Sequence, residues 1–310
     1  MTTLSGTANR RAPAPSSHSA DLARAITRRA STQSYATIRL LADRDRAADA
    51  YRAYAYFRWI DDIIDGPAGV AVDQPAFLRR QQALVEAGYQ GYMPGGLCPE
   101  ETLLAELIAG DEEPNSGLRT YLDNMMAVMA IDQERRGRLI TAAELDRYID
   151  LLATGVMGAL LHFIGHDCPA PRSAARSRAV QGACIIHMLR DMDEDCRIGY
   201  YNIPAEYLAA HAIGVDDRDH PAYRNWVAAR VALARDCFRD GLAYIAQVGN
   251  ARCRLAGFAY VARFEWMARL IERDDYRLRA TYPERKSPQA GLWMGWRTVS
   301  SLGLGRAAGR

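Results

Sequence analysis

Apolar residues recur along most of the chain with the spacing of an α-helix. From Ala20 to Asp65 they return every three or four positions, which is the pattern of helices that bury one face. Stretches rich in Gly, Pro and Asp interrupt this pattern and separate the helices. These stretches fall at residues 65–69, 91–96, 111–117, 165–173 and 214–223. Neither an alternating strand pattern nor a βαβ rhythm occurs, so the sequence predicts an all-α fold of about ten helices.

The two ends of the chain are expected to differ from the part between them. Residues 1–18 are rich in Pro, Ser, Thr and Ala, and we expect a disordered N-terminal tail there. No linker divides residues 19–290, which predicts a single helical domain. We expect residues 291–310 to form a flexible C-terminal tail.

Composition and charge argue against several classes of protein. The 310-residue chain is 49% apolar and 25% charged, and its net charge of +2 gives no indication of a nucleic-acid partner. No secretory signal is visible, and no run reaches the roughly 18 to 20 apolar residues of a membrane span. The cysteines lack CxxC spacing, so we expect a cytoplasmic protein with reduced thiols. Because no heptad seam is visible, we expect a monomer or a weak homodimer.

Two acidic patches stand among apolar side chains. The first is "YFRWIDDIID" (residues 56–65), in which Asp61, Asp62 and Asp65 lie between aromatic and branched residues. The second lies in "MLRDMDEDCRIGYYNIP" (residues 188–204). Each patch has two aspartates four residues apart, which a helix places on one face. Since desolvating an unpaired carboxylate costs several kcal/mol, both patches require cationic partners.

The residue types in these patches suit a magnesium and diphosphate site. Mg²⁺ prefers hard oxygen ligands and fills its shell with water and substrate phosphate. The candidate metal ligands are Asp61, Asp62, Asp65, Asp191, Glu194 and Asp195. Each patch also carries an arginine, Arg58 or Arg190, whose guanidinium can hold diphosphate oxygens. A single DxxxD is more often a solvated face or an ion pair, but two such patches favour a site that stabilises a diphosphate leaving group.

On these motifs the chain resembles the squalene/phytoene synthase family, from about Ser31 to Lys286. "YAYFRWIDDIID" is similar to the family's first aspartate-rich motif. "LRDMDEDCRIGYYNIP" is similar to the second, which usually reads RDxxEDxxxGRxYLP. The resemblance implies the catalytic residues Tyr54, Arg58, Asp61, Asp65, Arg190, Asp191 and Asp195.

Other stretches resemble the family's substrate-binding segments. "TQSYA" (residues 32–36) is similar to a Ser-rich substrate-binding stretch, and "TGVMG" (residues 154–158) to a small-residue motif that lines the prenyl tunnel. Together with two residues near the second acidic patch, the implied substrate-binding set is Thr32, Ser34, Tyr35, Gly155, Gly158, His187 and Asn202.

The resemblance also implies a fold and an activity. The fold is a single helical bundle of the isoprenoid synthase type around a central cavity, with the two aspartate motifs facing each other. The activity is a Mg²⁺-dependent, or Mn²⁺-dependent, head-to-head condensation of two C15 or C20 prenyl diphosphates to a squalene- or phytoene-type hydrocarbon. No glycine-rich nucleotide loop is present, but squalene synthases of the family use NADPH without one, so the need for NADPH stays open. Peripheral membrane contact is a further expectation, for release of the product.

Several positions depart from the family pattern. Cys184 and His187 stand where the family usually has Gln and Asn, and Phe264 replaces a Tyr. The GRxYLP ending reads Gly199-Tyr200-Tyr201-Asn202-Ile203-Pro204, so it has lost its Arg and its Tyr is shifted. These changes leave open a diverged enzyme that cyclises a single prenyl diphosphate or transfers it to another acceptor. A non-catalytic prenyl-lipid binder or assembly factor is a third alternative. The presence of every motif aspartate weighs against it.

Overall fold

A computed structural model describes residues 17–66, 73–166 and 173–307, with side chains described as far as Ser301. In these ranges the chain is helical and contains no strand, which confirms the predicted all-α class. The elements are α1 (Ser17–Ala30), α2 (Thr32–Leu41), α3 (Ala47–Ile64), α4 (Gln74–Tyr89), α5 (Pro99–Ala109), α6 (Gly117–Arg135), α7 (Ala142–Phe163), the 3₁₀ turn η1 (Ala174–Ser177), α8 (Arg178–Ile198), α9 (Ala205–Ala210), α10 (Pro221–Ala246), α11 (Ala251–Arg273), η2 (Pro283–Lys286) and α12 (Pro288–Ala307).

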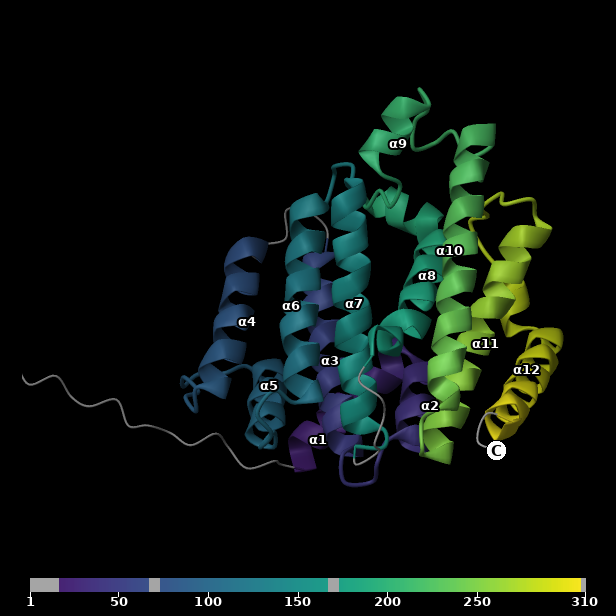
Figure 1. Ribbon diagram of the computed structural model, residues 1–310. Helices are drawn as coiled ribbons and strands as arrows, with labels where there is room; N and C mark the ends of the chain where they lie inside the picture. The colour runs from purple at the N-terminus through teal and green to yellow at the C-terminus, as the bar shows by residue number, and fades with distance from the viewer. Residues whose placement is uncertain (1–16, 67–72, 167–172, 308–310) are drawn as a thin grey trace, which may run out of the picture.

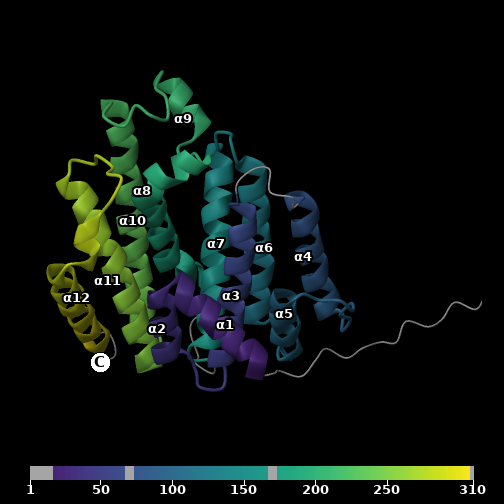
Figure 2. The ribbon, with the colours of Figure 1, turned by 180° about the vertical axis from the view of Figure 1, so that it is seen from behind.

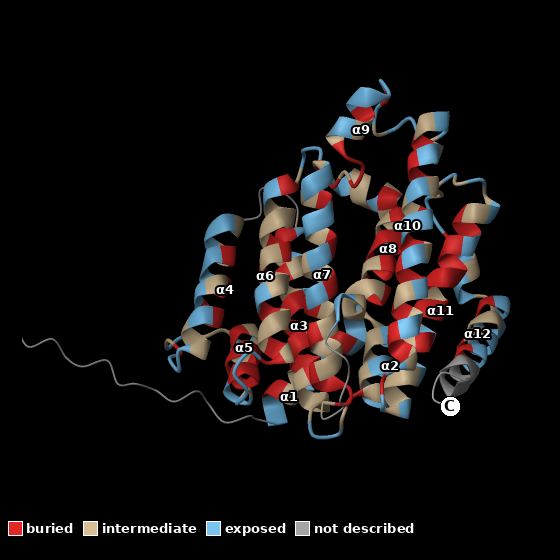
Figure 3. Ribbon diagram, viewed as in Figure 1, coloured by how far each residue is buried: buried red, intermediate tan, exposed pale blue. Residues whose placement is uncertain are grey.

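The long helices stand side by side in one bundle (Figures 1 and 2). Helices α4 and α5 cover one edge of the bundle, α12 covers the opposite edge, and α9 projects from one end. Buried residues lie between the helices, while the outer faces are exposed (Figure 3). The two largest buried clusters centre on α3, α5 and α6 and on α7, α8, α10 and α11, and a smaller one lies between α1, α3 and α5. Leu152 and Leu160 of α7 pack against both of the larger clusters, so α7 joins the two halves.

Local sequence signals fix the start of α7 and the end of α8, the helix that carries the second acidic patch. Helix α7 starts with a capping box in which the Thr141 hydroxyl accepts from the Glu144 amide at 3.2 Å and Glu144 accepts from the Thr141 amide at 2.9 Å. Helix α8 ends at Gly199, whose φ of 95° suits a residue without a Cβ. This left-handed residue turns the chain back toward the bundle, so that Tyr200 and Asn202 lie near the acidic patches.

Glycines allow α6 and α7 to approach closely. A Cβ on Gly158 would lie 2.6 Å from the Gly117 carbonyl oxygen, and a Cβ on Gly155 would lie 3.2 Å from the Asn124 Cβ. Gly155 and Gly158 therefore face α6, whereas the family resemblance implied that they line a prenyl tunnel. The residues of α7 that line an apolar cavity are instead Met157, Leu160 and Leu161.

The C-terminal segment differs from its prediction. Residues 291–307, expected to be part of a flexible tail, belong to α12, which packs on α11. The Trp293 ring lies 5.5 Å from the Trp266 ring, and Arg297 forms a two-pronged ion pair with Glu265 at 2.8 and 3.0 Å. These contacts anchor one face of α12. The predicted N-terminal tail lies outside the described residues up to position 16, while its last two residues already belong to α1.

Two further expectations concern membrane-spanning segments and the state of the cysteines. No helix in the described ranges is both long and apolar enough to cross a membrane. The described cysteines are all free thiols, as expected, and Cys168 lies outside the described residues.

The close contact between α6 and α7 makes a prediction about stability. Gly158→Ala should lower the free energy of unfolding by about 1–3 kcal/mol, because its Cβ meets backbone that can yield only by separating the helices. Gly291→Ala in α12 is the control, since its Cβ meets nothing within 4 Å and Ala gains up to about 1 kcal/mol over Gly in a helix. Denaturant unfolding of both variants and the wild type measures the change in the free energy of unfolding. A Gly158→Ala protein as stable as the Gly291→Ala protein would contradict the packing argument.

Candidate active site

Helix α3 carries the first acidic patch, which we call the α3 patch (Asp61, Asp62 and Asp65). Arg58, one turn earlier, pairs with Asp61 at 3.3 Å and with Asp62. Asp65 lies at the end of the helix, where the Tyr200 hydroxyl donates to its Oδ1 at 2.9 Å. The predicted charges therefore meet partners from their own helix and from the turn after α8.

Helix α8 carries the second patch, which we call the α8 patch (Asp191, Glu194 and Asp195). Asp191 accepts two hydrogen bonds from Arg190, at 2.6 and 2.5 Å, and lies 2.9 Å from the His187 Nε2. Burial raises the pKa of Asp191, but the bonds from Arg190 and His187 outweigh it, so the net shift is downward. The Asp195 Oδ2 accepts from the Asn202 amide at 2.7 Å, and Glu194 is exposed.

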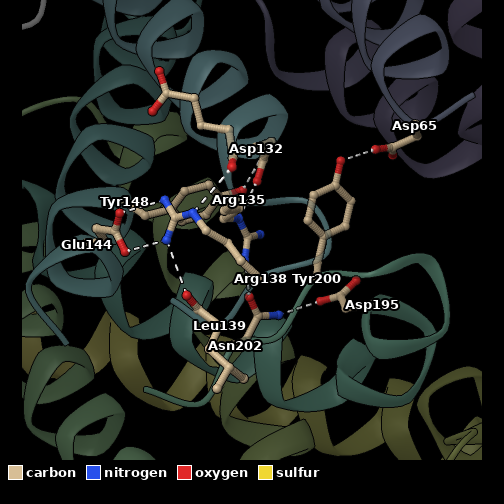
Figure 4. Close-up of polar contacts among 11 residues, drawn as sticks. Asp65, Asp132, Arg135, Arg138, Leu139, Glu144, Tyr148, Asp195, Tyr200 and Asn202 are labelled. Atoms are coloured by element: carbon tan, nitrogen blue, oxygen red, sulfur yellow. Dashed lines mark hydrogen bonds and ion pairs between the residues drawn. The ribbon is translucent and has the colours of Figure 1, made fainter. Parts of the chain in front are cut away.

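Arg135 at the end of α6 connects the two patches (Figure 4). Its Nε donates to Asp132 at 2.8 Å, and its Nη1 donates to the side-chain Oδ1 of Asn202 at 2.8 Å. The guanidinium lies between two rings, 4.9 Å from the centroid of Tyr148 and 4.8 Å from that of Tyr200. Asn202 donates a hydrogen bond to Asp195, and Tyr200 donates one to Asp65. The Arg135 guanidinium therefore contacts a hydrogen-bond partner of each patch.

Arg135 and its neighbours are buried, which gives the connection its strength. Arg135 is only 4% exposed, and the Tyr148 hydroxyl donates a hydrogen bond to the second carboxylate oxygen of Asp132 at 3.0 Å. Hydrogen bonds between charged groups away from water are stronger than those on a surface. The next residue, Arg136, donates to the carbonyls of Ile64 and Gly66 at 3.0 Å each. The loop after α6 is thus bonded to the end of α3 as well.

The carboxylates of the site repel one another. Burial, followed by the charge of Asp65, raises the pKa of Asp61 to about 6. Burial, followed by the charge of Asp191, raises the pKa of Asp195 to about 7. Asp132 adds to both shifts, and burial raises its own pKa as well. The two patches and Asp132 therefore form one electrostatic unit with more negative charge than its arginines balance.

This donor set fits a hard divalent cation. In the described ranges no three His, Cys, Asp or Glu side chains already converge on a common point. Mg²⁺ does not require such a cage, because it takes one or two carboxylates and completes its shell with water and phosphate oxygens. Asp61 and Asp195, whose pKa values are raised by burial and then by a neighbouring carboxylate, would be the ligands of such an ion, together with Asp65. Asp62 and Asp191 are already paired with Arg58 and Arg190.

The other predicted residues lie around this centre in different roles. Thr32, Ser34 and Tyr35 form the first turn of α2, where the Ser34 amide donates to the Ser31 hydroxyl at 3.0 Å. The Tyr35 ring packs 5.4 Å from the Tyr51 ring, so it joins α2 to α3. Tyr54 is partly buried on α3, one turn before Arg58.

Two hollows lie between α2 and the helices of the second half. The first is an apolar cavity of about 130 Å³ lined by residues of α2, α7, α8, α10 and α11, among them Met157, Leu160 and Tyr260. The second is a wider groove of about 860 Å³ lined by residues of α2, α8, α11, η2 and α12, and it contains Arg190. Leu41 and Ala256 line both hollows. An apolar chamber therefore adjoins a groove that reaches the α8 patch.

Sequence reasoning missed Asp132 and Arg135. Their spacing of three residues on α6 is that of an ordinary surface ion pair, and nothing in the sequence marks it as buried. Tyr200 was recognised only as a departure from the family motif. Its bond to Asp65 depends on the turn at Gly199, a tertiary feature.

These features define a class: an all-α bundle with facing carboxylate patches beside an apolar chamber. Comparisons with known proteins agree with the class and identify the family. The sequence profile described as squalene/phytoene synthase matches residues 27–289. The chain belongs to the squalene/phytoene synthase family, whose members are head-to-head prenyltransferases.

Relatives and solved structures support this assignment. The chain is 29% identical to a phytoene synthase of Thermus thermophilus, over 71% of this chain and 74% of that one. It is 28% identical to a presqualene diphosphate synthase of Zymomonas mobilis, over 65% and 66% of the two chains. The fold matches the crystal structure of squalene synthase HpnC from Alicyclobacillus acidocaldarius with a TM-score of 0.66 at 19% identity, covering 84% of this chain and 96% of that one. A dehydrosqualene synthase matches with the same TM-score at 16% identity, covering 94% and 96%.

The raised pKa of Asp61 predicts how stability depends on pH. Its folded pKa of about 6 lies above its usual value of 3.8, so the stability that its proton provides is present below pH 4 and lost as the pH rises through 6. Without divalent ions, Asp61→Asn should therefore be more stable than the wild type at pH 8 and lose this advantage near pH 4. We expect the Asp61→Asn protein to exceed the wild type by about 1 kcal/mol in free energy of unfolding at pH 8. The effect is small because solvent screens a side chain that is 38% exposed.

Asp62→Asn is the matched control, because this neighbouring carboxylate is 53% exposed and paired with Arg58. Thermal melting in the presence of a chelator, at pH 8 and at pH 4, compares the two variants with the wild type. A gain for Asp62→Asn equal to that for Asp61→Asn would show a general charge effect and contradict the specific repulsion.

Proposed function

We propose that the protein is a Mg²⁺-dependent prenyltransferase that condenses two C15 or C20 prenyl diphosphates head to head and releases diphosphate. The observation that carries the proposal is the pair of carboxylate patches on α3 and α8, linked through Arg135 and set beside an apolar cavity. The names of the relatives, a phytoene synthase and presqualene diphosphate synthases, support the same chemistry. Mn²⁺ is an alternative ion, and NADPH is needed only if the product is reduced.

Each part of the site has a physical role in this reaction. Mg²⁺ bound to the carboxylates supplies positive charge to the departing diphosphate. Arg58 and Arg190 lie beside the carboxylates of the two patches, and their remaining N–H groups can donate to diphosphate oxygens. Apolar side chains of the cavity and of the adjoining groove would contact the prenyl chain and keep water from an allylic cation.

One observation favours a second candidate, a diverged enzyme that cyclises or transfers a single prenyl diphosphate. His187 stands where the family usually has Asn, and its Nε2 lies 2.9 Å from Asp191. Its ring also lies 6.3 Å from the Phe264 ring, which replaces a family Tyr. With His187 and Phe264 both changed from the family residues, the site could bind one prenyl diphosphate instead of the two that head-to-head condensation requires.

Product analysis distinguishes these candidates. Pure protein is incubated with farnesyl or geranylgeranyl diphosphate and either Mg²⁺ or Mn²⁺, with and without NADPH. We expect diphosphate release and a C30 or C40 product, or its cyclopropyl diphosphate precursor. A cyclic or transferred product from one C15 or C20 unit would establish the second candidate. No consumption of either substrate would contradict both.

Asp195→Asn tests the α8 patch. The change removes one charge with almost no change in volume, and the Asn202 amide can still donate to the new side chain. Turnover should fall by roughly 10²-fold or more, because a positioned charge in a metal-assisted site contributes several kcal/mol. Asp193→Asn is the control on the same helix, since that carboxylate pairs with Arg197 and Arg218 instead. Equal turnover in the two variants would contradict the assignment of Asp195.

His187→Asn tests the second candidate. It restores the residue usual in the family and removes the contact with Asp191, so ionisation of the substrate should persist. If His187 directs a diverged reaction, the ratio of products should move toward head-to-head condensation. The readouts are diphosphate release and chromatography of the extract. An unchanged rate and product ratio would assign His187 to packing.

A further inference from the structure

Helix α12 has an exposed apolar stripe. Leu292, Trp296 and Val299 are 77%, 64% and 67% exposed, and their spacing of four and three residues places them on one face. The opposite face is anchored on α11 by Trp293 and Arg297. Single exposed apolar residues are common, but three large ones on one face of an anchored helix indicate a surface that has a partner.

The groove beside this stripe is basic. Its charged lining residues are Arg190, Arg263, Arg285 and Lys286, and no Asp or Glu lines it. Arg285 and Lys286 are exposed and lie just before α12. The charge around the stripe therefore complements an anionic partner.

The stripe, the groove and the apolar cavity lie next to one another. Val299 belongs to the stripe and also lines the groove, as Met294 of the same helix does. Leu41 and Ala256 line both the groove and the apolar cavity. Leu255, which is 44% exposed, adds a further apolar side chain at the groove. An apolar molecule leaving the cavity through the groove would emerge beside α12.

We propose that α12 docks the enzyme on the surface of an anionic lipid bilayer, with Leu292, Trp296 and Val299 entering the acyl region and Arg285 and Lys286 at the headgroups. Helices that lie in a membrane interface combine an apolar face, basic residues and often a Trp at the headgroup level. The docking is inferred from the surface of α12 and the basic residues beside it, independently of the proposed function. Only its purpose, delivery of an apolar product into the membrane, rests on the proposed function.

Vesicle flotation of the full chain, without substrate, tests the docking. Vesicles of phosphatidylcholine alone are compared with vesicles that also contain phosphatidylglycerol. We expect binding to the anionic vesicles that weakens with salt, since each basic residue near such a surface contributes roughly fivefold in partition. Leu292→Ser should weaken partition by roughly tenfold or more, because a large apolar side chain no longer leaves water. In Trp296→Phe, most of the vesicle-induced blue shift of tryptophan fluorescence should be lost.

Leu233→Ser, at an exposed leucine on α10, is the matched control and should bind vesicles as the wild type does. Diphosphate release from detergent-dispersed substrate should be the same for Leu292→Ser and the wild type, which separates docking from catalysis. Failure of the wild type to float with anionic vesicles, or equal flotation of Leu292→Ser, overturns the proposal. A dimer that Leu292→Ser dissociates, without vesicle binding by the wild type, would assign the stripe to a second copy of the chain and also overturn it.

Discussion

The aspartates repel one another within each patch, and Asp132 of α6 adds to the repulsion in both. The buried guanidinium of Arg135 links the groups that hold the two patches in place. It bonds Asp132 and Asn202 and lies between the rings of Tyr148 and Tyr200. Its positive charge only partly offsets the surrounding carboxylates, because the pKa values of Asp61 and Asp195 are still raised to about 6 and 7. The fold thus holds together a charge distribution that a bound cation would neutralise.

Much of the local architecture serves to place Arg135. Close packing at Gly117 and Gly158 fixes α6 against α7, which brings Arg135 of one helix against Tyr148 of the other. The left-handed turn at Gly199 returns the chain so that Tyr200 and Asn202 reach both the guanidinium and the acidic patches. Because these supports come from α6, α7 and the turn after α8, and all meet at Arg135, loss of one of them would disturb both patches together.

The sequence was sufficient to predict the all-α class, the family and the helices that carry the aspartates, since those depend on local periodicity and on motifs. It was insufficient for Asp132 and Arg135, because a pair three residues apart on a helix looks the same whether solvated or buried. The orientation of Gly155 and Gly158 toward α6 was missed for a similar reason: small residues suit a tunnel wall and a helix contact equally. Helix α12 was missed because its exposed Leu292 and Trp296 and its glycines obscure the helical pattern, although Trp293 and Arg297 anchor it.

The central claim is that the two patches together bind a divalent cation and diphosphate, and ligand-induced thermal stabilisation measures this without turnover. Wild-type protein is melted with Mg²⁺ alone, with inorganic diphosphate alone and with both, beside the Asp61→Asn, Asp195→Asn and Asp193→Asn variants. A ligand that binds only the folded state raises its melting temperature according to its concentration relative to Kd. The account predicts a rise for the wild type and Asp193→Asn that requires both ligands and is lost in Asp61→Asn and Asp195→Asn. An equal rise in all four proteins would contradict it.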